Sequence, residues 1–206
     1  MNEKFFSLPE KRQDLIRSSA MLEFGENTFK KTSADAIAKR AGVSKGLLFH
    51  YFKDKRELYL YLYQYALDVC VKHYMLKSYD FGETDFFLAL EMGHKVKMEM
   101  VRRYPGLFRF VMRTYYERDS VLSPKLRQGL DDLMESTIRD FLSRMDLYKF
   151  KDGVDPYQVI RLLLLASEGM LAETNASSAE EINALFAEYK RHADMLRQFL
   201  YKEEYL

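Results

Sequence analysis

The pattern of helix start and stop signals constrains the fold of this chain more than any other feature. Across 206 residues there are only nine glycines and four prolines, and no run rich in Val, Ile and Thr alternates between apolar and polar positions as a strand does. Apolar residues recur instead at helical spacing between capping residues. The sequence therefore predicts an all-α fold of about nine helices without a sheet.

Capping residues set the expected boundaries of these helices. Ser33 and Ser44 suit N-caps, and Gly42 suits the left-handed turn between two short helices. Asp54 and Glu57 have the spacing of a capping box, with Glu57 reaching back to the cap. The nine helices are expected at about residues 9–25, 33–41, 44–52, 54–77, 85–103, 107–118, 123–145, 155–174 and 177–206.

The composition excludes several classes of protein. A single cysteine, Cys70, rules out an internal disulfide framework and a cysteine-based zinc site. The longest apolar run, residues 162–166, is far shorter than the roughly 20 residues that span a bilayer. The first six residues lack the apolar core of a signal peptide. We therefore expect a cytoplasmic protein without a metal, a cofactor or a membrane partner.

The charge of the chain is unevenly distributed. Residues 1–57 hold 12 basic and 8 acidic side chains, a net charge of +4, although the whole chain carries only +1. A basic excess at one end favours docking of a polyanion there.

Residues 33–57 have the anatomy of a helix-turn-helix, because two short helices flank Gly42-Val43-Ser44. The second short helix has only about two turns and cannot be stable alone, so its neighbours must hold it. The apolar residues expected to bury together around it are Ile37, Val43, Leu48, Phe52, Phe24 and Phe29.

The other residues of the second short helix are expected on its outer face. Lysines there would contact phosphates, and Leu47 would be free to touch a thymine methyl group if Leu48 points inward. Solvated surface positions are the alternative for the lysines. Core positions are the alternative for Phe49 and Tyr51, but Phe24, Phe29 and Phe52 already fill that role. The expected outer face comprises Lys45, Gly46, Leu47, Phe49, His50 and Tyr51.

Residues 24–58 resemble the N-terminal DNA-binding domain of the TetR family of transcriptional regulators. The resemblance rests on Ala-Gly-Val-Ser-Lys-Gly at 41–46, Phe-His-Tyr-Phe at 49–52, and Lys55 with Glu57-Leu58. It implies a DNA-binding domain at 1–54, with the second short helix in the major groove, and an effector-binding and dimerisation domain at 55–206. The expected contacts with a double-stranded operator are Thr32, Ser33, Ser44, Lys45, Gly46, Leu47, Phe49, His50, Tyr51, Lys53 and Lys55.

Three residues depart from the family pattern. Phe49 stands where a tyrosine is common, so a phosphate hydrogen bond is lost. Thr28 stands where a glycine usually ends the first helix, and Asn27 is expected to take the left-handed angles instead. Glu23 occupies a position that is usually apolar.

Aromatic and Met residues crowd positions 86–145, which suits an ordinary helical core or an adaptable ligand cavity. Glu168 is unusual because four leucines precede it closely, so it should be paired, face a cavity, or reach water or Arg161. The resemblance implies a small-molecule effector in this region. The expected effector-binding residues are Phe108, Met112, Tyr115, Tyr116, Phe141 and Glu168.

The last helix has two apolar faces, of which one serves the chain's own core and the other needs a partner. The resemblance implies that the last two helices form a homodimer interface with a second copy. The residues expected in that interface are Leu162, Leu163, Met170, Tyr189, His192, Leu196 and Phe199.

The leading interpretation is a sequence-specific, ligand-responsive repressor that binds a palindromic operator as a dimer. The alternative is an activator or architectural DNA-binding protein of the same fold with no effector. An enzyme is disfavoured because the four histidines and the cysteine show no triad or metal spacing, and no phosphate loop occurs.

Overall fold

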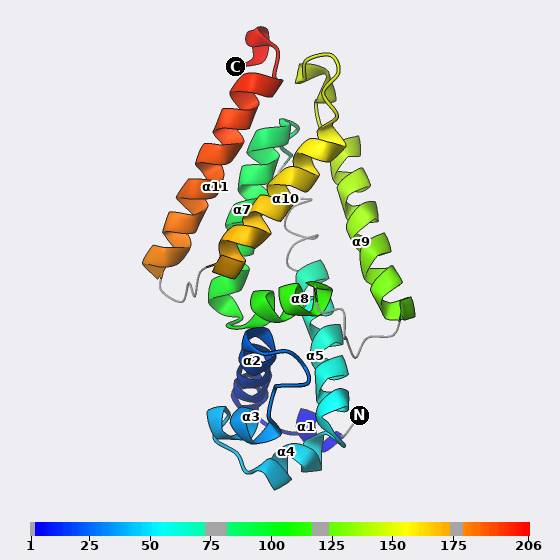
Figure 1. Ribbon diagram of the computed structural model, residues 1–206, viewed down its shortest axis with the longest axis vertical. Helices are drawn as coiled ribbons and strands as arrows, with labels where there is room; N and C mark the ends of the chain where they lie inside the picture. Colours follow the sequence, from blue (N-terminus) through cyan, green and yellow to red (C-terminus); the bar gives the residue numbers. More distant parts are fainter. Residues whose placement is uncertain (1–2, 73–81, 117–123, 174–178) are drawn as a thin grey trace. The chain divides into compact units, whose positions relative to one another are not determined.

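The computed structural model describes residues 3–72, 82–116, 124–173 and 179–206 (Figure 1). These residues form ten α-helices and no strand, which confirms the expected all-α class. A four-residue helix at the start was not expected. The helices are α1 (Glu3–Phe6), α2 (Glu10–Glu26), α3 (Ala34–Arg40), α4 (Lys45–Tyr51), α5 (Lys55–Cys70), α7 (Phe86–Arg103), α8 (Leu107–Tyr116), α9 (Pro124–Ser143), α10 (Pro156–Glu173) and α11 (Ala179–Leu200).

The chain divides into two compact units. Unit 1 comprises Met1–Val71 and Arg103–Arg127, so it holds α1 to α5 and α8. Unit 2 comprises Lys72–Arg102 and Gln128–Leu206. This division describes packing alone, and the functional boundary expected after residue 54 stays a prediction.

Local capping explains where the short helices of unit 1 begin. The Ser33 side chain accepts hydrogen bonds from the first-turn amides of α3, and the Ser44 side chain accepts one from the Leu47 amide. Gly42 has φ +61°, the left-handed angle expected of it. Asn27 is different, because its φ of −127° and ψ of 155° are extended. The prediction of a left-handed Asn27 is therefore wrong.

The start of α5 follows the expected cap with one change. Asp54 accepts a hydrogen bond from the Glu57 amide, but the Glu57 carboxylate accepts from the Lys53 amide instead of reaching the cap residue itself. The expected end of this helix near residue 77 lies outside the described residues.

Packing of α8 against α2 dominates unit 1. A Cβ atom added at Gly25 of α2 would lie 2.8 Å from the Arg109 Cβ, and one added at Gly106 would lie 2.7 Å from the Leu22 amide nitrogen. The Tyr59 and Thr114 hydroxyls, both buried, are 2.9 Å apart between α5 and α8. Because a side chain at Gly25 or Gly106 would overlap the neighbouring helix, these two glycines permit the close approach of α2 and α8.

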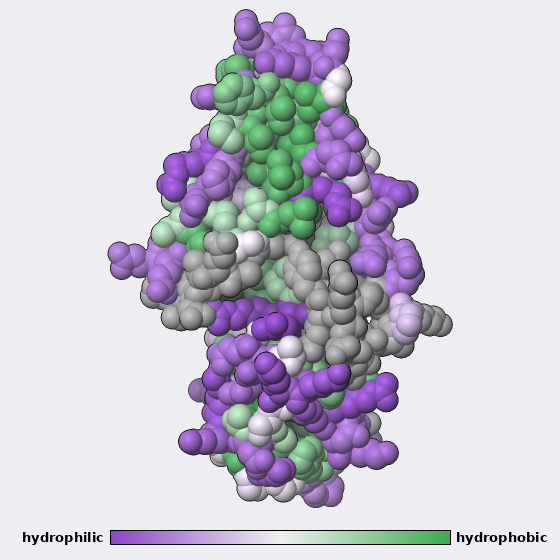
Figure 2. Space-filling view, viewed as in Figure 1, coloured by the Kyte–Doolittle hydropathy of each residue, from purple (hydrophilic) through white to green (hydrophobic). Residues whose placement is uncertain are grey.

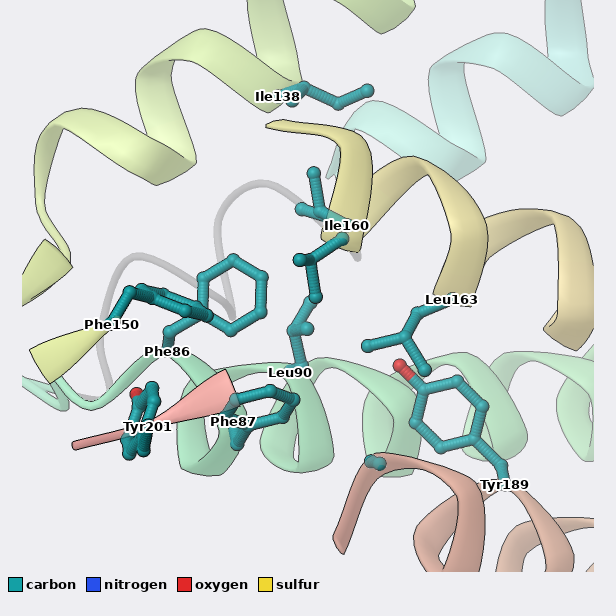
Figure 3. Packing of buried hydrophobic residues seen from close by; sticks show 11 residues of the cluster. Phe86, Phe87, Leu90, Ile138, Phe150, Ile160, Leu163, Tyr189 and Tyr201 are labelled. Carbon is teal, nitrogen blue, oxygen red and sulfur yellow. The ribbon is translucent and has the colours of Figure 1, made fainter. Parts of the chain in front are cut away.

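The core of unit 2 is an aromatic cluster at the start of α7 (Figure 3). Phe86, Phe150 and Tyr201 make edge contacts at ring-centroid distances of 4.9–5.1 Å. Buried Asp85 caps α7 and pairs with Lys149 at 3.1 Å. These contacts fix the end of the chain after α11 to the start of α7 within the same unit. None of the helices in the described ranges is long and apolar enough to cross a membrane.

Candidate nucleic-acid interface

The turn between α3 and α4 is held by backbone groups and one arginine. The Val43 amide donates to the Ala38 carbonyl at 3.0 Å, and the Arg12 guanidinium of α2 donates to the Gly42 carbonyl at 2.9 Å. Ile37 and Ala38 of α3 are buried beneath this turn. The angle between the two helices is thus fixed by contacts with the rest of unit 1.

The rotation of α4 about its own axis agrees with the expected outer face. Leu48 is 1% exposed, whereas Leu47 is 37% exposed. Lys45, Gly46 and His50 are also exposed. A Cβ atom at Gly46 would meet nothing closer than the Ser44 hydroxyl at 4.0 Å, so an approaching backbone or phosphate has open space there. Contact of these residues with DNA stays a prediction.

Tyr51 does not lie on the outer face, so that expectation is wrong. It is 7% exposed, and its ring contacts Phe5 of α1 at 6.0 Å. Phe52 ends the helix in an extended conformation and is also buried. Tyr51 is covered because α1, which the sequence pattern did not reveal, packs against this end of α4.

Lys55 and Thr32 have structural partners inside unit 1. The Lys55 ammonium donates to the carbonyls of Phe29 and Thr32 at 2.7 and 2.9 Å, and lies 4.5 Å from the centre of the Phe29 ring. Burial lowers the pKa of Lys55 below its ordinary value. Thr32 is 3% exposed, and its hydroxyl donates to the carbonyls of Glu23 and Thr28. The interior placement of the Thr32 side chain argues against the direct contact expected of it.

The remaining expected DNA contacts lie at the surface or partly covered. Ser33 and Ser44 are exposed caps, Lys53 is exposed, and Phe49 is half-buried. Lys45 forms an ion pair with Asp35 of α3 at 2.8 Å, and both side chains are more than half exposed. An exposed pair of this kind contributes little to stability, so it presents no barrier to a phosphate.

Glu23 is accommodated by an arginine that the sequence pattern did not single out. The Arg40 guanidinium of α3 lies 2.9 Å from the Glu23 carboxylate and 3.0 Å from that of Glu26. The hydrogen bond from Arg40 to Glu26, together with the nearby Glu23 charge, raises the pKa of Arg40. The acidic departure from the family pattern therefore ties α2 to α3.

Sequence reasoning also missed a polar network beneath α1. Gln13 donates to the carbonyls of Phe6 and Leu8, and accepts from Arg17 at 2.6 Å. Arg17 in turn donates to the Tyr61 hydroxyl at 2.7 Å. No spacing signal marks this network, because its members come together only through the tertiary packing of α1, α2 and α5.

The expected effector residues whose side chains the structure describes belong to different units. Phe108 and Met112 are half-buried on α8 of unit 1, whereas Phe141 packs against the core of unit 2. The side chains of Tyr115, Tyr116 and Glu168 lie outside the described residues. A cavity of about 680 Å³ lies along α5 in unit 1, and its lining contains none of the six.

The expected dimer residues divide into buried and exposed groups. Leu163 is 1% and Tyr189 4% exposed, and Figure 3 shows both pointing into the core of unit 2, so their assignment to an intermolecular face is wrong. Met170 and Leu196 pack partly against the same core. Among the described side chains of α10 and α11, the large apolar residues that are exposed are Leu162, Leu165, Met195 and Phe199, and His192 is exposed as well.

These exposed residues lie on two helices in contact with each other, α10 and α11. Figure 2 shows apolar surface over α10 in the upper part of the view. Phe199, at 69% exposed, and Leu162, at 56%, are the most open of the four apolar side chains. Unit 2 thus presents an apolar surface that its own core leaves uncovered.

Comparisons with known proteins agree with this architecture. The family model described as bacterial regulatory proteins, tetR family, matches residues 16–62. An HTH-type transcriptional regulator of Staphylococcus aureus strain USA300 is 26% identical over 144 residues, which are 66% of this chain and 76% of that protein. A second one, from strain MRSA252, is 25% identical over 127 residues, covering 58% and 69% of the two chains.

Solved structures share the fold over nearly the whole chain. A TetR family transcriptional regulator from Chloroflexus aurantiacus has a TM-score of 0.71 at 21% identity, covering 98% of this chain and 99% of that one. The ketosteroid transcriptional regulator KstR2 of Mycobacterium tuberculosis has a TM-score of 0.72 at 16% identity, covering 96% and 98%. With the helix-turn-helix geometry, these relations show that residues 16–62 form a DNA-binding domain of the TetR family and that the chain shares the fold of solved TetR family regulators.

Proposed function

We propose that the protein acts in the cytoplasm as a dimeric, ligand-responsive repressor, in which α4 of each copy reads one half of a palindromic operator. The observation that carries this proposal is the sharp division of α4 into a buried side at Leu48 and an open side at Lys45, Gly46 and Leu47. A helix enters the major groove with such an open side, where small and apolar side chains can reach base edges.

The surroundings of α4 support phosphate contacts that hold it in register. A lysine has three N–H donors, and Lys55 uses two of them on the carbonyls of Phe29 and Thr32. In this proposal the third donates to a phosphate, with the side chain already ordered. An ordered donor loses less conformational entropy on binding than a free one.

The exposed apolar side chains of α10 and α11 support the dimer. In this proposal they pack against the same helices of a second copy, which buries Leu162 and Phe199. Phe199→Glu should convert the dimer to a monomer at micromolar concentration in sedimentation velocity, because a carboxylate would be buried there unpaired. Tyr148→Glu is the matched control, since Tyr148 is 59% exposed in unit 2 but lies outside both helices. A Phe199→Glu protein that remains dimeric would exclude this interface.

In this proposal the effector binds against α8. Phe108 and Met112 on α8 are half-buried and belong to the same unit as α4. A ligand that contacts them could therefore change the direction of α4 through packing within that unit. The cavity along α5 includes neither of them. The second candidate is a DNA-binding protein of the same fold without an effector. Retention of operator binding across a broad screen of small molecules would support the second candidate.

Selection of duplexes from a random-sequence library tests the central claim. The purified protein should enrich a palindrome whose half-sites lie roughly 34–36 Å apart, one helical turn, or a multiple of that distance. Binding measured at several salt concentrations should show the steep dependence that phosphate contacts produce. Enrichment of no sequence over the starting library would refute operator recognition.

A further inference from the structure

The first helix, α1, lies ahead of the part of the chain that the family model matches. It spans only Glu3–Phe6, whereas the match begins at residue 16. Its Phe5 side chain is nevertheless fully buried, at 0% exposed. A terminal segment of four helical residues has no stability of its own. Its order must therefore come from what Phe5 packs against.

The Phe5 ring lies between the end of α4 and the side of α5. Its centroid is 6.0 Å from that of Tyr51, the last residue of α4, and 4.9 Å from that of Phe52, the residue that caps α4. It also lies 5.4 Å from the Tyr61 ring of α5. Figure 1 shows α1 beside α4 at the same end of unit 1, in agreement with the contacts between the two helices.

The backbone that carries Phe5 is also fixed. Gln13 of α2 is 9% exposed, and its amide donates to the Phe6 carbonyl at 3.2 Å and to the Leu8 carbonyl at 2.8 Å. The Arg17 guanidinium lies 5.5 Å from the centre of the Phe5 ring. The segment is therefore held by polar bonds from α2 as well as by its aromatic contacts.

We propose that Phe5 is a positioning residue for the reading helix α4, so that residues 3–8 help to determine which DNA sequence the protein prefers. The inference rests on the proposed operator binding and adds to it an element outside the family match. Phe5 acts through Tyr51 and Phe52, and it touches no base in this mechanism.

The two ends of α4 explain why such a residue is needed. The N-terminal end is held by the Ser44 cap and by the turn at Gly42 and Val43. With seven residues, α4 is too short to fix its own direction from one end. Phe5 holds the other end, so its loss should let α4 tilt. A tilt changes contacts with base edges, which need defined geometry, more than it changes contacts of Lys55 with phosphate.

The test compares Phe5→Ala and Phe5→Leu with the unaltered full chain. Affinity is measured for the duplex that the unaltered protein selects from a random library and for a scrambled duplex of the same length and composition. The ratio of the two affinities should fall about tenfold in Phe5→Ala, the discrimination of roughly one base pair, and about threefold in Phe5→Leu. The salt dependence of binding should stay the same, because no phosphate contact is removed.

Phe24 provides the matched control. It is also 0% exposed in unit 1, but its ring contacts are with Phe29, Tyr59 and Phe110, away from the end of α4. Phe24→Ala and Phe24→Leu should lower stability comparably and leave the affinity ratio unchanged below the melting temperature. If an alanine variant does not fold, the two leucine variants give the comparison.

Three outcomes would overturn the inference. The affinity ratio could stay constant in both Phe5 variants, or it could fall as far in the Phe24 variants as in those of Phe5. Either result leaves operator binding intact and removes only the positioning role. If the unaltered chain selects no duplex, the proposed function fails and this inference fails with it.

Discussion

Substituting alanine for individual glycines tests whether the close packing of α8 on α2 holds unit 1 together. Gly106 precedes α8 with φ +81°, and an added Cβ atom would lie 2.7 Å from the Leu22 amide nitrogen. Gly42 has φ +61° in the same unit, but nothing lies within 4 Å of its added Cβ. Gly25 has an ordinary helical position and an added Cβ 2.8 Å from the Arg109 Cβ. The three sites separate backbone strain from steric overlap.

The expected costs follow from this geometry. An alanine in the left-handed region costs about 1–2 kcal/mol, which is the whole expected effect of Gly42→Ala. Overpacking against backbone adds about 1–3 kcal/mol, so Gly106→Ala should cost about 2–5 kcal/mol in total. Gly25→Ala carries only the overpacking cost, reduced by up to about 1 kcal/mol because alanine favours a helix over glycine.

Urea unfolding followed by circular dichroism measures these costs, and hydrogen exchange of the α2 and α8 amides assigns the loss to unit 1. Gly106→Ala should be the least stable of the three variants. Gly42→Ala, which has backbone strain alone, and Gly25→Ala, which has steric overlap alone, should both be more stable. If Gly106→Ala unfolds at the same urea concentration as Gly42→Ala, the approach of Leu22 to Gly106 does not constrain the protein, and the packing argument is refuted.

Two further predictions concern α4 and a buried histidine. Leu48→Ala should lower the free energy of unfolding by about 2–5 kcal/mol, because the side chain is 1% exposed. Leu47→Ala should leave the melting temperature nearly unchanged and weaken the preference at one base position per half-site. Equal melting temperatures of the two variants would mean that α4 is rotated about its axis from the orientation described. Burial lowers the pKa of His94 from its ordinary 6.5 to about 3. Because the unfolded chain binds this proton at a higher pH than the folded chain, stability is present above pH 6.5 and is lost as the pH falls toward 3, by about 2 kcal/mol between pH 7 and pH 5. His94→Phe should remove that part of the pH dependence in urea unfolding, and an unchanged slope would contradict the burial of a neutral imidazole.

Features set by neighbours in the chain could be predicted from the sequence. The caps at Ser33 and Ser44 and the left-handed turn at Gly42 depend on the residues within one helical turn of each, so their positions follow from residue type alone. The inward direction of Leu48 and the outward direction of Leu47 follow from helical periodicity. These local rules were sufficient to locate α4 and most of its open side.

Features set by distant contacts could not be predicted in the same way. The outward placement of Tyr51 assumed that Phe24, Phe29 and Phe52 already fill the core. Tyr51 instead lies three residues after buried Leu48, on the same face of α4, and α1 covers its ring. The two-faced pattern of α11 did not show which face meets the protein's own core, and Tyr189 was assigned to the wrong one. The position of the Lys55 ammonium depends on the carbonyls of Phe29 and Thr32, which lie in a loop that no sequence pattern identifies as a binding partner.

The position of α8 in unit 1 narrows how an effector would act under the proposed function. Phe108 and Met112 belong to the same compact unit as α4, and α8 contacts α2 through Gly25 and Gly106. A ligand that moves α8 must therefore move α2 or break backbone contacts that leave no room for sliding. Because Arg12 and Gln13 of α2 hold the helix-turn-helix turn and the α1 segment, a shift of α2 reaches both ends of α4. A ligand that binds the shifted arrangement more tightly would favour that arrangement and so change the direction of the reading helix. The shift in free energy between the two arrangements is limited to the difference in the ligand's binding free energy for them.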